Sequence, residues 1–319
     1  RSSDLTYNIY LYIYHDQVPP EACAYNAAEL ARLSYSQLLK LALHGQEAAI
    51  HKGGQLVQAH KGKGPIDFCE SYRSLLISSH QGKVLHRSLR QHQTDLYESF
   101  MQHQQIGGRR GVPVTLGLHH LRSFMRHQQR CGRSCSILYL DLKEAFYRIL
   151  RPLTLDNPWT DAEIAGLAQR LRLPEGALAD LYEYLKMPNA VAVAGLPHHV
   201  RNYLTALHSD TWFYVEGQAD ICRTSVGSRP GDCFADTIFG YLWAKVLRQI
   251  EGELCQYQIL DAFHAVDGCA LFGCNGPTDS APRAYLGPCW MDDLAICLSG
   301  STADELVHRL GIMTSTLMD

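Results

Sequence analysis

The chain has 319 residues, of which 46% are hydrophobic and 19% are charged, and its formal net charge is -3. This composition excludes a disordered chain and is sufficient for a large core and two subdomains. Eleven cysteines without even spacing, and a start at Arg1 without a basic, apolar and small-residue processing pattern, argue against secretion and a disulfide framework. We therefore predict reduced thiols and an intracellular location, in the nucleus or the cytoplasm.

The charge is unevenly distributed along the chain. Residues 1–133 hold 16 Lys and Arg against 9 Asp and Glu, which leaves 13 against 23 for the remainder. Such a charge distribution suits a protein that binds a polyanion with its basic part and metal ions with its acidic part. Two ordinarily solvated surfaces are the alternative reading. No stretch approaches the roughly 20 apolar residues of a membrane span, so no membrane partner is predicted.

The first part of the chain carries helical patterns around one strand-like segment. Residues 27–43 have leucines near helical spacing, which predicts an amphipathic helix that ends near Gly45. Residues 51–64, HKGGQLVQAHKGKG, place a short apolar piece between Lys-Gly clusters, which predicts a strand or hairpin with flexible basic ends. Helices are also expected over residues 72–90 and 115–129.

The second part alternates apolar runs with turns. Residues 136–140 form a short apolar run typical of a buried strand, and Asp141 stands where that run ends. Two helices are predicted within residues 160–186. A turn cluster at residues 227–231 precedes an apolar stretch at 237–247, which predicts a helix packed against a sheet.

Residues 289–298, CWMDDLAICL, have two apolar arms around Asp292 and Asp293, the pattern of a tight hairpin with its acids at the turn. Joining a nucleotide to a primer is an in-line displacement at phosphorus, in which two Mg²⁺ ions about 3.5 to 4 Å apart stabilise the attacking and leaving oxygens. Mg²⁺ prefers oxygen ligands, so a few Asp residues that converge from two strand ends suffice. Alone, an Asp pair is common and an Asp after a strand is often a helix cap. Together they predict a site at which Asp141 meets Asp292 and Asp293.

Six segments resemble, in order, motifs of reverse transcriptases, with the closest likeness to non-LTR (LINE-like) retrotransposon polymerases. The three core motifs are matched by SILYLDLKEAFYRIL, GSRPGDCFADTIFGYLW and CWMDDLAICL. Three earlier segments look like the family's fingers and entry motifs: HKGGQLVQAHKGKG, SYRSLLISSHQGKVLHRSLR and QIGGRRGVPVT. The resemblance covers roughly residues 46 to 300. It implies an α+β fold with right-hand polymerase fingers and palm, in which helices back an antiparallel palm sheet.

The resemblance also implies a domain order. It gives a helical lead-in over 1–45, the first part of the fingers over 46–95 and the first part of the palm over 96–151. Fingers and connecting helices follow over 152–229, and the second part of the palm over 230–319, truncated before the thumb. No endonuclease segment is recognised.

The resemblance implies roles for individual residues. Asp141, Asp292 and Asp293 would be catalytic and would hold two Mg²⁺ ions, or Mn²⁺ in their place, with the carbonyl of Leu142 assisting. The residues that would bind substrate are Phe146, Arg73, Lys61, Lys63, Gly231 and Met291.

Phe146 matches the family's aromatic gate, where a ring under the sugar would clash with a 2'-hydroxyl; its alternative is a core Phe on a helix. Arg73 matches a fingers residue that holds the incoming triphosphate, a task suited to a planar, permanently charged group. Lys61 and Lys63 could share that task or form a solvated loop.

The sequence departs from the family pattern at several positions. Pro230 stands where the family commonly has Gln, which removes a side-chain amide contact, although Gly231 still allows close approach of the backbone. Trp290 replaces the preferred Tyr or Phe, and His51 occupies a place where relatives carry Trp.

The predicted function is an RNA-directed DNA polymerase domain of a retrotransposon, a nucleotidyltransferase that extends a primer 3' end with dNTPs. Its partners are an RNA template and a DNA primer, and no protein partner is predicted. One alternative is a truncated, non-catalytic remnant that keeps the fold and weak nucleic-acid binding. Another is a metal-dependent nuclease or phosphatase, which explains Asp292 and Asp293 but leaves Phe146, Arg73 and the Gly231 turn without purpose.

Cysteine and histidine pairs raise a further possibility, a zinc site. Cys131 with Cys135, and Cys269 with Cys274, have nearly suitable spacing, but no second pair stands at zinc-finger distance, so free thiols are expected. Two adjacent pairs, His119 with His120 and His198 with His199, are expected at the surface, because neighbouring residues on a helix point apart.

Overall fold

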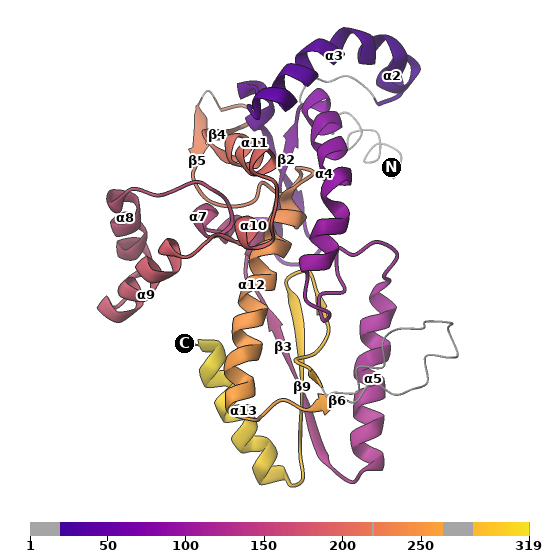
Figure 1. The fold of residues 1–319 in the computed structure, drawn as a ribbon, viewed down its shortest axis with the longest axis vertical. Helices are drawn as coiled ribbons and strands as arrows, with labels where there is room; N and C mark the ends of the chain where they lie inside the picture. The colour runs from indigo at the N-terminus through magenta and orange to yellow at the C-terminus, as the bar shows by residue number, and fades with distance from the viewer. Residues whose placement is uncertain (1–19, 219, 264–282, 319) are drawn as a thin grey trace. The chain divides into compact units, whose positions relative to one another are not determined.

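A computed structural model describes residues 20–218, 220–263 and 283–318 (Figure 1). Their structure is mixed α+β, as the sequence predicts. The chain divides into two compact units that alternate along it. Unit 1 comprises Arg1–Phe100 and Glu144–Leu242, and unit 2 comprises Met101–Lys143 and Trp243–Asp319. The breaks therefore follow residues 100, 143 and 242, where the sequence predicts changes of subdomain after 95, 151 and 229.

Unit 1 contains a four-stranded sheet of order β2-β1-β4-β5. Strand β1 (Gly53–His60) pairs antiparallel with β2 (Tyr72–Ser78) and parallel with β4 (Thr211–Val215), which pairs antiparallel with β5 (Ile221–Thr224). The prediction of a helix over residues 72–90 is wrong for residues 72–78, which form β2, and the helix begins at His80. Residues 72–78 pair with β1 along their whole length, so this long-range ladder overrides a local pattern that fits either structure.

Along the chain, helices precede and separate the strands of this sheet. The helix α3 ends where Gly45 adopts a left-handed conformation, and α8 starts at a capping box in which Thr160 and Glu163 bond reciprocally. The elements are α2 (Pro20–Tyr25), α3 (Ala27–His44), η1 (Ala49–Lys52), η2 (Cys69–Ser71), α4 (His80–Phe100), α6 (Ala145–Arg148), α7 (Arg151–Thr154), α8 (Asp161–Leu171), α9 (Glu175–Lys186), α10 (Ala190–Val193) and α11 (His198–His208).

The helix α3 forms as expected, but it buries none of its residues among the described part of the chain. Leu33 and Leu43 are 61% and 67% exposed. Its apolar residues therefore do not contribute to the core of unit 1.

Unit 2 is built on a sheet of order β3-β9-β8. Strand β3 (Ser134–Asp141) pairs antiparallel along its full length with β9 (Asp293–Gly300), which also pairs antiparallel with β8 (Cys289–Trp290). Every residue of β9 after the first is buried, the pattern of a strand covered on both faces.

Helices cover the two faces of this sheet. Leu121 and Phe124 of α5 (Val114–Arg130) pack on Ala295 and Cys297 of β9. The helix α13 (Ala303–Met318) lies on the other side of β3 and β9 (Figure 1). The sheet is antiparallel and backed by helices, as expected.

The remaining elements are α12 (Ala235–Gln256), which runs from unit 1 into unit 2, and a short ladder of β6 (Ala262–Phe263) with β7 (Arg283–Ala284). In the described segments, no helix combines the length and apolar character that crossing a bilayer requires. The second predicted cysteine pair, Cys269 and Cys274, lies outside the described residues.

Candidate active site

The end of β3 and the start of β9 bring two of the predicted acids together in unit 2. Asp141 is the cross-strand partner of Asp293. Directly opposite residues of an antiparallel pair have Cβ atoms about 4.5 to 5.5 Å apart, and like charges there are destabilising. Both side chains are exposed. A cation bound between these carboxylates would therefore offset a repulsion that the fold builds in.

The third acid, Asp292, lies in the two-residue turn of the hairpin that joins β8 and β9. The register pairs Trp290 with Asp293, so Met291 and Asp292 form the turn. Met291 has a φ of 56°, a left-handed conformation that two-residue hairpins often give to Gly. For a non-glycine residue this costs about 1 to 3 kcal/mol, and such strain clusters at functional sites. The residue before the two acids is thus held in an unfavourable conformation.

The hairpin contacts the segment at residues 104–107, which leads into the predicted QIGGRRGVPVT motif at residues 105–115. The amide of Cys289 donates to the carbonyl of Gln104 at 2.7 Å, and the amides of Ile106 and Gly107 donate to the carbonyl of Cys289 at 2.9 and 3.2 Å. A Cβ added to Gly107 would stand 2.4 Å from the backbone nitrogen of Met291. Only glycine allows this approach without moving the hairpin.

The buried thiol of Cys289 is hydrogen-bonded to the strained turn. It accepts a hydrogen bond from Trp243 Nε1 at 3.0 Å and donates to the carbonyl of Met291 at 3.2 Å. Burial raises the pKa of this thiol to about 12, and the nearby charges of Asp292 and Asp293 act in the same direction. The thiol therefore keeps the proton that it donates. Sequence reasoning missed both Cys289 and Gly107, because neither residue type carries metal chemistry at this position.

For the primer extension that the sequence predicts, replacing Gly107 by Ala is expected to lower the rate by about a hundredfold, because displacing a catalytic group by about 1 Å has an effect of that size. The measurement is the rate of single-nucleotide addition. Gly311→Ala is the matched control, since nothing lies within 4 Å of a Cβ at that position of α13. Equal rates for the two variants would show that the hairpin tolerates the shift.

The donor set suits a hard cation. It consists of carboxylate oxygens and the carbonyl of Leu142, which directly follows Asp141. Over the described ranges, no three His, Cys, Asp or Glu side chains are grouped so that they could hold a metal ion by themselves. Mg²⁺ commonly takes only one or two carboxylates and completes its shell with water and substrate phosphates. The residues present fit that mode of binding.

The predicted substrate-binding residues Arg73 and Gly231 lie in unit 1. Gly231 has a φ of 107°, and a Cβ there would stand 2.3 Å from the carbonyl oxygen of Leu76. The neighbouring Pro230 accepts a hydrogen bond from the amide of Leu76 at 3.0 Å. Leu76 belongs to β2, which also carries the exposed Arg73. The turn at residues 227–231 is therefore anchored on the strand of Arg73.

The same turn also contacts the segment of Phe146. The amide of Ser228 donates to the carbonyl of Phe146 at 2.7 Å. The ring of Phe146 is half-buried and tilted against that of Phe239, with centroids 4.9 Å apart. The structure thus brings Phe146, Gly231 and the strand of Arg73 into one cluster. The three acids belong to unit 2.

The two lysines lie in the exposed loop between β1 and β2. Lys61 Nζ donates to the carbonyl of Glu70 at 2.7 Å, and its amide donates to the carbonyl of Ser71 at 2.8 Å. Lys61 therefore helps to shape the loop. Lys63 is exposed, which fits both a triphosphate-binding role and a solvated loop.

Arg151 in unit 1 is a buried cation with a side chain that is 1% exposed. The sequence does not predict a role for it. Its guanidinium donates to the carbonyls of Thr224, Val226 and Gly227 at 3.0 Å each. It also donates to the carbonyl of His208 at 2.7 Å. One buried cation therefore organises the backbone that leads from β5 into the turn at residues 227–231.

The cysteine and histidine pairs do not build a zinc site among the residues that the structure describes. Cys131 and Cys135 form no disulfide. His119, His198 and His199 are exposed, as expected. His120 differs, because it is half-buried with its ring centroid 4.6 Å from that of Tyr285, and burial lowers its pKa.

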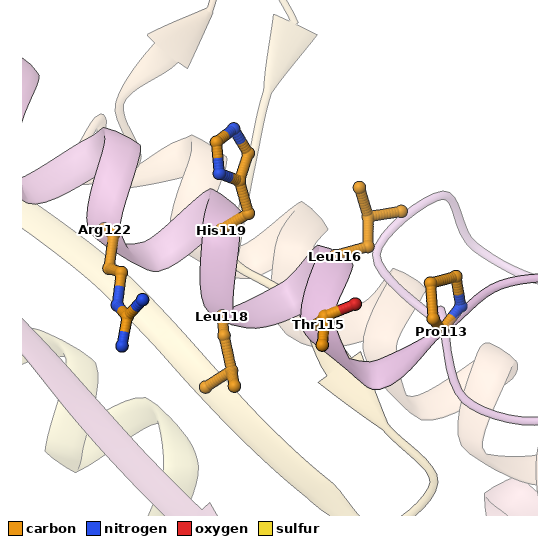
Figure 2. A pocket seen from close by; sticks show the side chains of 6 residues that line it. All are labelled: Pro113, Thr115, Leu116, Leu118, His119 and Arg122. Atoms are coloured by element: carbon orange, nitrogen blue, oxygen red, sulfur yellow. The ribbon is translucent and has the colours of Figure 1, made fainter.

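The helix α5 also carries a surface hollow of about 440 Å³. Figure 2 shows that Leu116 and His119 project to one side of the helix, whereas Leu118 and Arg122 project to another. Pro113 and Thr115 complete the lining, which includes none of the predicted acids. This hollow is therefore not the site of the predicted chemistry.

No protein-family model matches the chain, and no curated protein matches its sequence.

Proposed function

We propose that this chain is the RNA-directed DNA polymerase domain of a retrotransposon, which extends a primer 3' end with dNTPs on an RNA template. The observation that supports it most is the cross-strand pairing of Asp141 with Asp293, with Asp292 at the adjacent strained turn. Like charges directly opposite each other in a sheet are destabilising, and a cation bound between the two carboxylates would offset that cost. The order of the motifs around them favours nucleotide addition over other metal-dependent phosphate chemistry.

The chain's own residues would each do one part of this work. Asp141 and Asp292, with Asp293, position the metal ions against the triphosphate. Bound Mg²⁺ stabilises the negative charge that develops on the attacking and leaving oxygens. Arg73 holds the triphosphate with a planar, permanently charged group. Gly231 lets the backbone approach the nucleotide closely.

The direct experiment supplies the purified protein with an RNA template, a DNA primer, dNTPs and Mg²⁺. The proposal expects the primer to be lengthened by nucleotides complementary to the template. A folded protein that binds the template and primer but adds nothing would favour the non-catalytic remnant. Cleavage of the nucleic acid when dNTPs are omitted would favour the nuclease.

The basic character of α5 supports a nucleic-acid partner. Residues 99–140 contain six Arg and no Asp or Glu. Arg122, Arg126 and Arg130 are exposed at four-residue spacing, so they share one side of the helix. Within the described segments they form no ion pair. Unneutralised cations in a row suit a chain of phosphates.

Replacing Arg122, Arg126 and Arg130 together by Gln is expected to reduce the slope of log affinity against log salt by about 2 to 3. Each lost phosphate contact removes about 0.7 to 0.9 from this slope. The measurement is binding of the template and primer in EDTA over a range of salt concentrations, which needs no catalysis.

The matched control for α5 removes the same charge elsewhere, by replacing Arg32, Arg170 and Lys186 with Gln. Arg32 and Lys186 pair with Glu29 and Glu183 on exposed surfaces. An equal slope in both triple variants would show that total charge, and not α5, sets the salt dependence.

Phe146→Ala is expected to lower the preference for dNTPs over rNTPs by about tenfold or more, because the ring would no longer clash with a 2'-hydroxyl. The measurement is the ratio of kcat/KM for the two nucleotides. Phe100→Leu is the control for lost packing, since Phe100 is also in unit 1 and is 9% exposed. An unchanged ratio in Phe146→Ala would assign Phe146 to the core alone.

A further inference from the structure

A buried network of charged and polar side chains in unit 1 lies outside the predicted active-site residues. Glu47 follows α3 and is 7% exposed. Its Oε1 lies 2.6 Å from Nδ1 of His51, and its Oε2 lies 2.8 Å from Nε2 of His86 on α4. The hydroxyl of Tyr203 on α11 also donates to Glu47 Oε2. One carboxylate thus ties together three helical elements.

His86 connects this carboxylate to a second one. Its Nδ1 lies 3.2 Å from Oδ2 of Asp232, an ion pair without the alignment of a hydrogen bond. Oδ2 of Asp232 also lies 3.6 Å from a guanidinium nitrogen of Arg229, and Oδ1 accepts from the amide of Phe234 at 3.1 Å. His86 and Asp232 are 1% and 8% exposed. His86 therefore bridges two buried carboxylates.

This bridge requires the charged form of His86. A neutral imidazole has one N–H, so one of its nitrogens would face a carboxylate with a lone pair. The imidazolium has a donor for each carboxylate. Burial opposes the charge, but Asp232 and Glu47 outweigh burial and raise the pKa of His86 to about 9. Burial also opposes ionisation of Glu47, yet hydrogen bonds from His51, His86 and Tyr203 hold its pKa at about 2.

The network ends on the turn that carries Gly231. Arg229 has a φ of 61°, which is unfavourable for a side-chain-bearing residue. Its guanidinium donates to the carbonyls of Leu207 at 3.1 Å and His51 at 2.9 Å. Strained backbone of this kind persists only where its surroundings over-determine it. The contacts of Arg229 and Asp232 with the buried network hold this turn on one side. The hydrogen bond from the amide of Leu76 to the carbonyl of Pro230 holds it on the other.

We infer that the charged His86, held between Glu47 and Asp232, clamps the Arg229–Asp232 turn and so keeps Gly231 in place on the edge of β2 for the incoming nucleotide. His86 and Glu47 are positioning residues. The nucleotide part of this inference rests on the proposed function. When His86 loses its charge, Asp232 loses its main partner on α4 and the turn loosens. Affinity for the nucleotide then falls, whereas the carboxylates of unit 2 are unaltered.

The direction of the pH effect follows from the pKa of His86. This pKa lies above the ordinary 6.5, so the clamp is fully formed below about pH 6.5 and is lost as the pH rises through about 9. The other ionisable groups around His86 are Glu47, His51, Tyr203, Arg229, Asp232 and Cys233. Burial raises the pKa of the hydroxyl of Tyr203 and of the thiol of Cys233, while Arg229 and His86 outweigh burial and lower the pKa of Asp232.

Amide hydrogen exchange tests the clamp without any need for catalysis. The reporter is the amide of Leu76, which donates to Pro230. In the unmodified protein its protection, corrected for the intrinsic exchange rate, should fall about tenfold or more between pH 7 and 10. His86→Gln should show the low value at every pH. The exposed His92→Gln on the same helix should behave as the unmodified protein. Protection that is independent of pH and equal in all three proteins would overturn the clamp.

Steady-state kinetics then connects the clamp to nucleotide binding. His86→Gln should raise the KM for dNTPs about tenfold while kcat changes by less than about twofold, the signature of a lost binding interaction. If no protein extends primers but Leu76 protection follows the pH, the proposed function fails and the clamp stands. If primers are extended and neither KM nor Leu76 protection responds, the clamp fails and the function stands.

A second variant covers the case in which His86→Gln does not fold. Glu47→Gln keeps the pair of His86 with Asp232 but removes one of the two charges that hold the proton on His86. The fall in Leu76 protection should then move to a lower pH. A transition at an unchanged pH in this variant, or a flat profile in the unmodified protein, would contradict the clamp.

Discussion

Asp292→Asn should lower primer extension by at least about a thousandfold, because each 1.36 kcal/mol of lost transition-state stabilisation costs tenfold in rate and a metal supplies several kcal/mol. Asn has the size of Asp but lacks its charge, so the hairpin turn is preserved. Asp141→Asn should have an effect of the same size. The measurement is the rate of single-nucleotide addition at saturating dNTP and Mg²⁺.

The control for this prediction is Asp304→Asn, the same chemical change at an exposed position of α13 in unit 2. Its rate should stay within about twofold of the unmodified protein. Asp141→Asn should also raise the free energy of unfolding by about 0.2 to 1 kcal/mol, because it removes a like charge opposite Asp293. Unreduced activity in Asp292→Asn would refute its assigned role.

Arg151→Met should lower the free energy of unfolding by about 3 to 5 kcal/mol, because buried backbone carbonyls would lose a charged hydrogen-bond donor. Its carbonyl partners would remain buried, and each acceptor left without a hydrogen bond costs about 1 to 3 kcal/mol. Burial and the nearby Arg229 lower the pKa of Arg151 to about 9, so the guanidinium is still charged at neutral pH. Urea denaturation measures the effect through the transition midpoint.

Arg148→Met is the matched control for Arg151, because Arg148 stands three residues earlier and pairs with Glu144 on the surface, at 60% exposure. Its loss should change stability by less than about 0.5 kcal/mol. A loss of less than about 1 kcal/mol for Arg151→Met would mean that water replaces the guanidinium.

The hairpin of Asp292 could be predicted because its signal is local. Two apolar arms and an acidic centre occupy ten consecutive residues, and the observed pairing of Cys289 with Leu294 follows from that pattern. Residues 72–78 show the opposite case. Their apolar residues fit a helix or a strand equally well, and the pairing with β1 decided the outcome.

The buried network could not be predicted from the sequence. Glu47, His86 and Asp232 are distant along the chain, and each looks alone like an ordinary surface residue. Their burial arises only when three helical elements pack around the turn that precedes α12. The sequence marked two parts of this network: His51, noted as a departure from the family's Trp, and the turn at residues 227–231 that contains Arg229. Arg151 gave no such sign, since Arg is mostly exposed in folded proteins.

The central claim is that three acids hold divalent ions at one place, and Mn²⁺ binding measured by electron paramagnetic resonance tests it most directly. The titration is made with template, primer and a nucleotide that cannot be joined. Two ions should bind to the unmodified chain, and Asp141→Asn and Asp292→Asn should each weaken that binding by about tenfold or more. Binding of Mn²⁺ by either variant with unchanged affinity would contradict the account.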